Sequence, residues 1–323
     1  MAQITMREML DAGVHFGHQT QRWNPKMKPY VYTDRGGIHI IDLQKSVVHA
    51  RRAAEKVKEV AAQGGRMIFV GTKKQAVEPI KEASAKCGQF YVTKRWLGGT
   101  LTNFQTVKSS IDRLKKIDQM REKGELDYLS KKERASMEKE YGKLSEYLDG
   151  IREMKEAPEL LFVVDLTKEH IAVAEARRLG IPVVGIADTN SDPEVIEFPI
   201  PGNDDAIRSI KLFADMAAEA YLEGAKLWEE KVRAMGQQQK EEESRARAAE
   251  AAKAQEEAKA QPTAPGAAGP AVVKVSKGRK LVAAGTADDV EIAMELEGGE
   301  SAAPSEDAES EAADSETAEA EKQ

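Results

Sequence analysis

Residues 158–193, PELLFVVDLTKEHIAVAEARRLGIPVVGIADTNSDP, decide the fold class that the sequence predicts. An uninterrupted apolar run at 160–164 is typical of a buried strand. From 168 to 179 the apolar residues recur every three or four positions, which predicts a helix, and a glycine closes it. A second apolar run follows at 182–186, and each run ends near an aspartate. A strand, a crossover helix and another strand predict two parallel strands of one sheet.

The same alternation recurs on both sides of this stretch. Further strands are predicted at the apolar runs 38–41, 67–70, 90–92 and 198–200. Helical periodicity lies between them, at 43–63, in a helix ending near 87, and from 204 past 221. We therefore expect an α/β fold, a doubly wound parallel sheet of about five strands covered on both faces. Its residues are 38–104 and 157–224.

Residues 105–156 interrupt the alternation with two predicted amphipathic helices. Each carries a short apolar stripe, and charged residues fill the remaining positions. The tetrapeptide SKKE at 130–133 is a capping box that begins the second helix. We expect an antiparallel helical hairpin inserted into the α/β domain. A partner surface is the favoured role, and a solvated hairpin that only packs on the sheet is the alternative.

Residues 1–37 are expected to form a short helix and then an extended arm. Residues 11–37 show little periodicity, and loops of this length are usually functional or disordered. Their aromatic rings argue against disorder. Cations alternate with these rings, a pattern typical of RNA-binding arms, at Arg22, Lys26, Lys28 and Arg35. An arm packed on its own domain is the alternative, and both hold if the rings point inward and the cations outward.

Residues 91–104, YVTKRWLGGTLTNF, join a predicted strand to a predicted helix. Two cations and an indole suit contact with phosphates and bases, and two glycines let a backbone approach a partner closely. We predict that this loop meets a nucleic acid. A tight connection with Trp96 as a core plug is the alternative. Lys73 and Lys74, after the predicted strand 67–70, are further candidates for phosphate contact, with plain solvation as their alternative.

The net charge of −7 hides an uneven distribution. Residues 236–323 hold 10 of the 48 Lys and Arg residues and 20 of the 55 Asp and Glu residues, which leaves the first 235 residues at +3. An acidic total therefore does not exclude a nucleic-acid partner, because local patches decide binding. Residues 225–323 are expected to form a charged, largely disordered tail, with a transient helix as the alternative for its first part. We expect no secretory signal and no membrane span, and the single cysteine fits a reducing cytoplasm.

The sequence predicts no catalytic set. The turn after residue 70 lacks both the GxxxxGK[ST] and the GxGxxG phosphate-binding spacings. Carboxylates suit a divalent cation such as Mg²⁺, and the weak candidates are Asp188, Asp204 and Asp205. Helix capping by Asp204 and turn formation by Asp192 are the favoured interpretation. A zinc site at His15 and His18 is disfavoured, because the neighbouring glycines argue against a helix. We expect neither an enzyme nor a required cofactor.

Four long motifs in one order carry a resemblance to a known family: MLDAGVHFGHQTQRWNPKMKPYVY, FVGTKKQA, RWLGGTLTNF and the stretch quoted first. Over about residues 5–224 the chain resembles the bacterial small-subunit ribosomal proteins of the S-two family. The resemblance implies a flavodoxin-like domain with an inserted hairpin, seated between head and body of the small subunit. It also implies a cytoplasmic location in the ribosome and small-subunit ribosomal RNA as the partner. A further implied role is to help dock the ribosomal protein S-one for mRNA recruitment.

Carried onto this sequence, the resemblance implies RNA-facing residues at Arg22, Trp23, Asn24, Lys26, Lys28, Lys73, Lys74, Lys94, Arg95, Trp96, Thr100, Thr102 and Asn103. Two other functions stay open. A nucleotide-using α/β enzyme would need a phosphate loop, which the sequence lacks. A protein-interaction scaffold would work through the hairpin.

Overall fold

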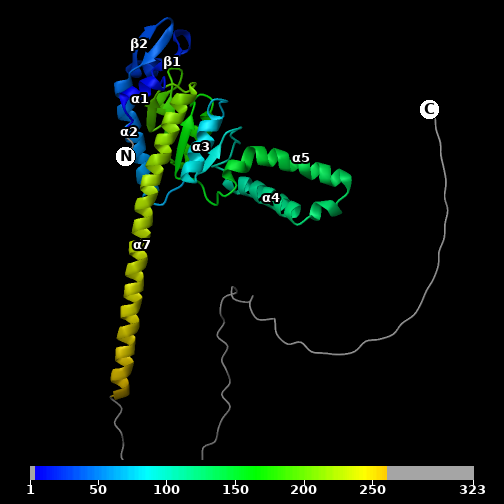
Figure 1. Cartoon of the computed structure of the whole chain (residues 1–323), viewed down its shortest axis with the longest axis vertical. Helices are drawn as coiled ribbons and strands as arrows, with labels where there is room; N and C mark the ends of the chain where they lie inside the picture. The colour runs from blue at the N-terminus through cyan, green and yellow to red at the C-terminus, as the bar shows by residue number, and fades with distance from the viewer. Residues whose placement is uncertain (1–3, 260–323) are drawn as a thin grey trace, which may run out of the picture. The chain divides into compact units, whose positions relative to one another are not determined.

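The computed structural model describes residues 4–259 and contains the expected parallel sheet (Figure 1). Its strands lie in the order β5-β4-β6-β7-β8, and every neighbouring pair is parallel. This is the strand order of flavodoxin-like folds, so the predicted fold class is confirmed. The strands are β4 (Met67–Val70), β5 (Phe90–Val92), β6 (Leu160–Val164), β7 (Val183–Ala187) and β8 (Phe198–Pro201).

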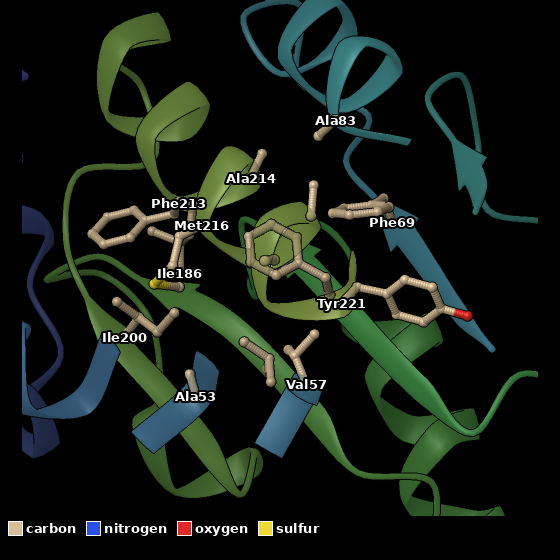
Figure 2. Close-up of a cluster of buried hydrophobic side chains, with 14 of the residues drawn as sticks. Ala53, Val57, Phe69, Ala83, Ile186, Ile200, Phe213, Ala214, Met216 and Tyr221 are labelled. Atoms are coloured by element: carbon tan, nitrogen blue, oxygen red, sulfur yellow. The ribbon is translucent and has the colours of Figure 1, made fainter. Parts of the chain in front are cut away.

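Helices cover both faces of this sheet because successive strand side chains point to opposite faces. One core lies under α2 (Leu43–Ala61), α3 (Val77–Cys87) and the first part of α7. Figure 2 shows Phe69 of β4, Ile186 of β7 and Phe213 of α7 among the side chains of this core. The other core lies under α6 (His170–Leu179) and the base of the hairpin. Both faces of the sheet carry side chains with no exposed area, so both faces are covered.

The hairpin consists of α4 (Phe104–Glu122) and α5 (Lys131–Leu148), joined through the short 3-10 helix η3 (Glu125–Tyr128). Figure 1 shows the two helices side by side, extending away from the sheet. Ser130 and Glu133 form the predicted capping box, since each side chain bonds the other's backbone N–H. The buried stripe of α4 comprises Val107, Ile111, Leu114 and Ile117. In α5 only Leu148 is buried, so most of that helix faces outward.

The N-terminal segment is more regular than an extended arm. After α1 (Met6–Asp11) it forms a three-stranded antiparallel sheet in the order β1-β3-β2. The apolar run predicted as a strand of the large sheet is β3 here, and it pairs with its own arm. Register shifts interrupt both pairings of β3. The arm strands are β1 (Phe16–Gln19), β2 (Val31–Arg35) and β3 (Ile38–Ile41), with 3-10 helices η1 (Thr20–Arg22) and η2 (Pro25–Tyr30) between β1 and β2.

Helix α7 (Ile207–Lys259) runs past residue 224, where the predicted α/β domain ends. Gly224 lies so close to α2 that a Cβ there would sit 2.4 Å from the carbonyl oxygen of Lys58. Beyond it, Glu, Lys, Gln and Ala are good helix formers, and residues 225–259 are helical, which agrees with the alternative given for the first part of the tail. The rest of that predicted tail, 260–323, lies outside the described residues. Within 4–259 no helix is long and apolar enough to cross a membrane.

Candidate nucleic-acid interface

The loop after β5 is closed around one carboxylate. Glu175, on α6, is 8% exposed and lies inside the loop. Its Oε1 accepts hydrogen bonds from the backbone N–H of Gly99 at 2.7 Å and from the indole N–H of Trp96 at 3.2 Å. Its Oε2 accepts from the backbone N–H of Leu101 at 3.0 Å and from the backbone and hydroxyl of Thr102 at 3.1 and 3.2 Å.

The electrostatics of Glu175 fit this structural role. Burial by itself raises the pKa of a carboxyl group, because it penalises the charged form. The hydrogen bonds from Gly99, Leu101 and Thr102 outweigh that effect and lower the pKa of Glu175 below its ordinary value. The carboxylate is therefore held charged, as the centre of the loop's fold.

Several predicted RNA contacts in this loop are turned inward. Trp96 is 5% exposed, so its ring offers no free face for a base. Thr100 is 2% exposed, and its hydroxyl donates to the carbonyl of Leu97 at 2.5 Å. The core-plug interpretation therefore describes Trp96 in this structure. The exposed candidates are Lys94, Arg95, Thr102 and Asn103.

The arm places its cations differently. Arg22 and Lys28 are exposed, and Trp23 is 37% exposed with its ring centroid 5.1 Å from that of His39. Lys26 is also exposed, but it pairs with two carboxylates, Asp192 at 2.8 Å and Glu194 at 2.7 Å. The arm's rings are not all turned inward, because Phe16 is 47% and Tyr32 75% exposed, so the interpretation with rings inward and cations outward holds only in part.

The arm is attached to the end of β7 by backbone contacts. The N–H of Asn24 donates to the carbonyl of Thr189 at 2.7 Å, and the N–H of His18 donates to the Thr189 hydroxyl at 2.9 Å. The Asn24 side chain accepts from the backbone N–H of Lys26, so it shapes the arm. These bonds place the arm at the carboxyl end of β7.

Lys73 is neither solvated nor free for phosphate contact. Its ammonium group lies 2.7 Å from Asp204 Oδ1, 2.9 Å from Asp205 Oδ1 and 3.1 Å from Asp165 Oδ2. Burial opposes its charge, but the charge of Asp204 dominates the neighbouring contributions that raise the pKa of Lys73. Lys74, the next residue, is exposed.

The carboxylates around Lys73 form an acidic cluster with His18. His18 Nδ1 lies 3.0 Å from Asp188 Oδ2, and this bond raises the pKa of His18. Burial, and after it the charge of Asp188, raise the pKa of Asp204 to about 7. Asp204 Oδ2 is buried and accepts no hydrogen bond from the described residues. Single ligand atoms of His18, Asp188 and Asp204 all lie within 4.8 Å of one another.

The structural roles predicted for Asp192 and Asp204 have different outcomes. Asp192 accepts from the backbone N–H of Glu194 and begins η5 (Pro193–Val195), as predicted. Asp204 does not cap α7. Asn203 forms a turn just before α7, since its side-chain oxygen accepts from the N–H groups of Asp205 and Ala206. Asp204 is turned into the acidic cluster because Lys73 holds it there.

Parallel strands bring these segments to one edge of the sheet. Lys94 and Arg95 follow β5, Lys74 follows β4, and the arm is attached behind β7. From β5 to β7 are three strand spacings of about 4.8 Å each, or roughly 14 Å. We call the exposed Arg22, Lys28, Lys74, Lys94 and Arg95 at this carboxyl edge the cationic edge.

Sequence reasoning missed Glu175, which organises the loop. The available signal was its position in α6, where Ala172, Val173 and Ala176 around it are buried. An acidic residue within an apolar helix stripe needs a partner, because a buried unpaired charge is costly. The sequence did not show which donors would surround it.

Comparison with known proteins places the chain next to one family. The sequence model of the family described as ribosomal protein S2 matches residues 9–224, which include the sheet, the hairpin and most of the arm. The chain is also 70% identical over 307 residues to the small ribosomal subunit protein uS2 of Bdellovibrio bacteriovorus. That similarity covers 93% of this chain and 98% of the relative, so it extends well beyond the matched family region.

Proposed function

Because the chain belongs to the ribosomal protein S2 family and is a structural constituent of the small ribosomal subunit in the cytoplasm, we propose that its cationic edge binds small-subunit ribosomal RNA. The binding is structural: the protein holds folded RNA and performs no reaction on it. Location between head and body, and help in docking the ribosomal protein S-one, are parts of this proposal that rest on the family resemblance.

One observation supports this RNA-binding surface: exposed cations from separate segments lie along one edge of the sheet. Arg22, Lys28, Lys74 and Arg95 form no ion pair with an acidic residue of the described chain. Lys94 pairs with Glu146 at 3.2 Å, but both side chains are about half exposed, and such surface pairs contribute little. The cations are therefore free to neutralise phosphates and release counterions.

The test compares two triple variants of the full chain. Arg22→Ala, Lys28→Ala and Arg95→Ala together remove most of the charge of the cationic edge. The matched control, Arg51→Ala, Lys81→Ala and Lys226→Ala, removes three exposed cations from α2, α3 and α7. Binding to transcribed small-subunit ribosomal RNA is measured across a salt series.

We expect the edge variant to bind more weakly and to lower the log–log salt slope by about one for each phosphate that it no longer neutralises. The control is expected to keep the wild-type slope. Equal slopes for the wild type and the edge variant would assign RNA binding to another surface. Sedimentation of the same variants with small subunits, and retention of the S-one protein, check the finer parts of the proposal.

We also propose that the acidic cluster holds a divalent cation. The four carboxylates Asp165, Asp188, Asp204 and Asp205 exceed the charge of Lys73 and His18, and a buried oxygen of Asp204 has no partner among the described residues. One imidazole and two carboxylates within reach of a single ion suit Zn²⁺ better than Mg²⁺, which prefers oxygen ligands alone.

Zinc titration of the chelator-treated protein tests this site. We expect one ion per chain, whose binding is abolished in Asp204→Asn and in His18→Ala, and a higher melting temperature when zinc is present. His170→Ala, which removes an exposed histidine outside the cluster, is the control. Zinc binding that Asp204→Asn and His18→Ala leave unchanged would exclude the cluster as the site.

A further inference from the structure

A cavity of about 580 Å³ opens beside the cationic edge. Its wall is formed by one side of α6, by Asn24 of the arm and by the segment from Asn190 to Val195 that follows β7. We call it the α6 cavity. Its volume is in the range of about 300–1,000 Å³ that is typical of small-ligand sites.

The lining of the α6 cavity combines an apolar floor with a polar rim. Leu166 and Val173 are buried beneath it, and Ala174 faces it from the exposed surface of α6. Arg177 and Arg178 also line it, and neither pairs with an acidic residue of the described chain. The one acidic lining residue, Asp192, is paired with Lys26.

An amide completes the lining. Asn190 Nδ2 lies 3.4 Å from His18 Nε2, which orients the side chain. Its Oδ1 is buried and has no hydrogen-bond partner within the described part of the chain. Buried polar atoms are rarely left unpaired, and a rotation of the Asn190 side chain would bring this oxygen to the cavity, where a bound molecule can donate to it.

We propose that the α6 cavity receives one unpaired nucleotide of RNA, an inference that rests on the proposed RNA-binding function. The base lies on the apolar floor, and Arg177 and Arg178 hold the phosphates on either side. The Asn190 side chain rotates so that its oxygen accepts a hydrogen bond from the edge of the base. An unpaired base is required because a duplex hides its base edges and is too wide to enter such a cavity. Asn24 connects the cavity to the arm, so both belong to one continuous surface.

The experiment fills the cavity without removing charge. Ala174→Trp adds a large ring from an exposed helix position, and Ala85→Trp makes the same change at an exposed position of α3 as the matched control. A third variant, Arg177→Ala with Arg178→Ala, removes the rim cations. Fluorescence anisotropy measures binding of oligouridylate and oligoadenylate too short to fold, of a blunt RNA duplex, and of small-subunit ribosomal RNA.

We expect Ala174→Trp and the double arginine variant to weaken single-strand binding by about tenfold, as removal of one stacked base would, and to leave duplex binding unchanged. Ala85→Trp is expected to bind every RNA as the wild type does. Thermal melting checks that each variant is folded. If Ala174→Trp does not fold, the result for the double arginine variant alone tests the inference.

Three results would overturn the inference. The first is single-strand binding by the cavity variants at the wild-type level, including the case in which they lose a protein partner instead. The second is an equal loss of single-strand and duplex binding. The third is a wild-type chain that binds ribosomal RNA but no single strand, which leaves the proposed function standing. A wild-type chain that binds no ribosomal RNA contradicts the proposed function itself.

Discussion

The loop after β5 and the N-terminal arm carry the same residue types and use them in opposite ways. In the loop, Trp96 and the polar groups turn inward and converge on Glu175. In the arm, Trp23 stays partly exposed and the cations face outward, while a few bonds to Thr189 hold the backbone. Similar composition therefore gives a closed loop in one place and an open one in the other.

The difference is set by what lies underneath each segment. The loop covers the apolar core on the α6 face, so every polar group that it buries needs a partner there. The arm forms its own small sheet and lies against the carboxyl edge, where most of its side chains are exposed or half-exposed. The loop is expected to matter first for stability, and the arm first for binding.

The largest expected effect is in the loop. Glu175→Ala leaves the N–H groups of Gly99, Leu101, Thr102 and Trp96 without their acceptor. We expect a loss of about 3–5 kcal/mol in the free energy of unfolding, measured by urea denaturation. Glu219→Ala, an exposed glutamate on α7, is the control and should change stability by less than about 0.5 kcal/mol. A loss for Glu175→Ala no larger than that of the control would show that the loop folds without this carboxylate.

A smaller effect is expected where the arm meets the sheet. A Cβ at Gly17 would lie 2.6 Å from Thr189 Cγ2 and 2.9 Å from its hydroxyl, so Gly17→Ala must displace the arm or the threonine. We expect a cost of about 1–3 kcal/mol and weaker RNA binding. Gly36→Ala is not a neutral control, because Gly36 has a positive φ. Gly98→Ala meets nothing within 4 Å and serves instead. Unchanged RNA binding by Gly17→Ala would show that the arm's attachment is irrelevant to function.

The arm's attachment is also expected to depend on pH. The folded-state pKa of His18 is raised, so its contribution to stability is complete below its unfolded value near 6.5 and is lost as pH rises through the folded value. Asp204, whose pKa is raised to about 7, acts in the same direction, because the folded state holds its proton longer than the unfolded state. Each group contributes at most about 1.4 kcal/mol per pH unit.

Urea denaturation in chelator-containing buffer measures this dependence. Stability should fall as pH rises past about 6.5, where His18 and Asp204 lose their protons in the folded state, and His18→Ala should flatten the profile there. Glu175 provides the contrast: its pKa is lowered, so its contribution is present above the unfolded pKa and is lost as pH falls through the folded pKa. If His18→Ala leaves the pH profile of stability unaltered, His18 is not the source of the pH dependence.

The smallest effect on stability is expected for Lys26→Ala. Lys26 bridges Asp192 and Glu194, but it is exposed, and exposed ion pairs contribute little to stability. We expect no measurable change in melting temperature. RNA binding should weaken modestly, since two unpaired carboxylates then remain near the cationic edge. A clear drop in melting temperature would mean that the arm is held by its side chains much as the loop is.

The fold was predictable because residues 158–193 and the other apolar runs carry their periodicity locally. The directions of side chains were not. Trp96 and Lys73 look like RNA contacts in sequence, but both are bound by acidic residues distant in the chain, Glu175 and Asp204. Of the arm's strands only β3 was predicted, as part of the large sheet, and β1 and β2 escaped prediction because register shifts break their alternation. Helix α7 extends beyond its prediction because an isolated helical composition says little about order.

Site-directed crosslinking within assembled small subunits tests whether the cationic edge faces ribosomal RNA. A photoreactive amino acid replaces Arg22 or Arg95 at the cationic edge, and Lys81 on α3 in the control. We expect crosslinks to small-subunit ribosomal RNA from positions 22 and 95, and far fewer from position 81. Crosslinks from 22 and 95 to proteins alone, or RNA crosslinks only from 81, would contradict it.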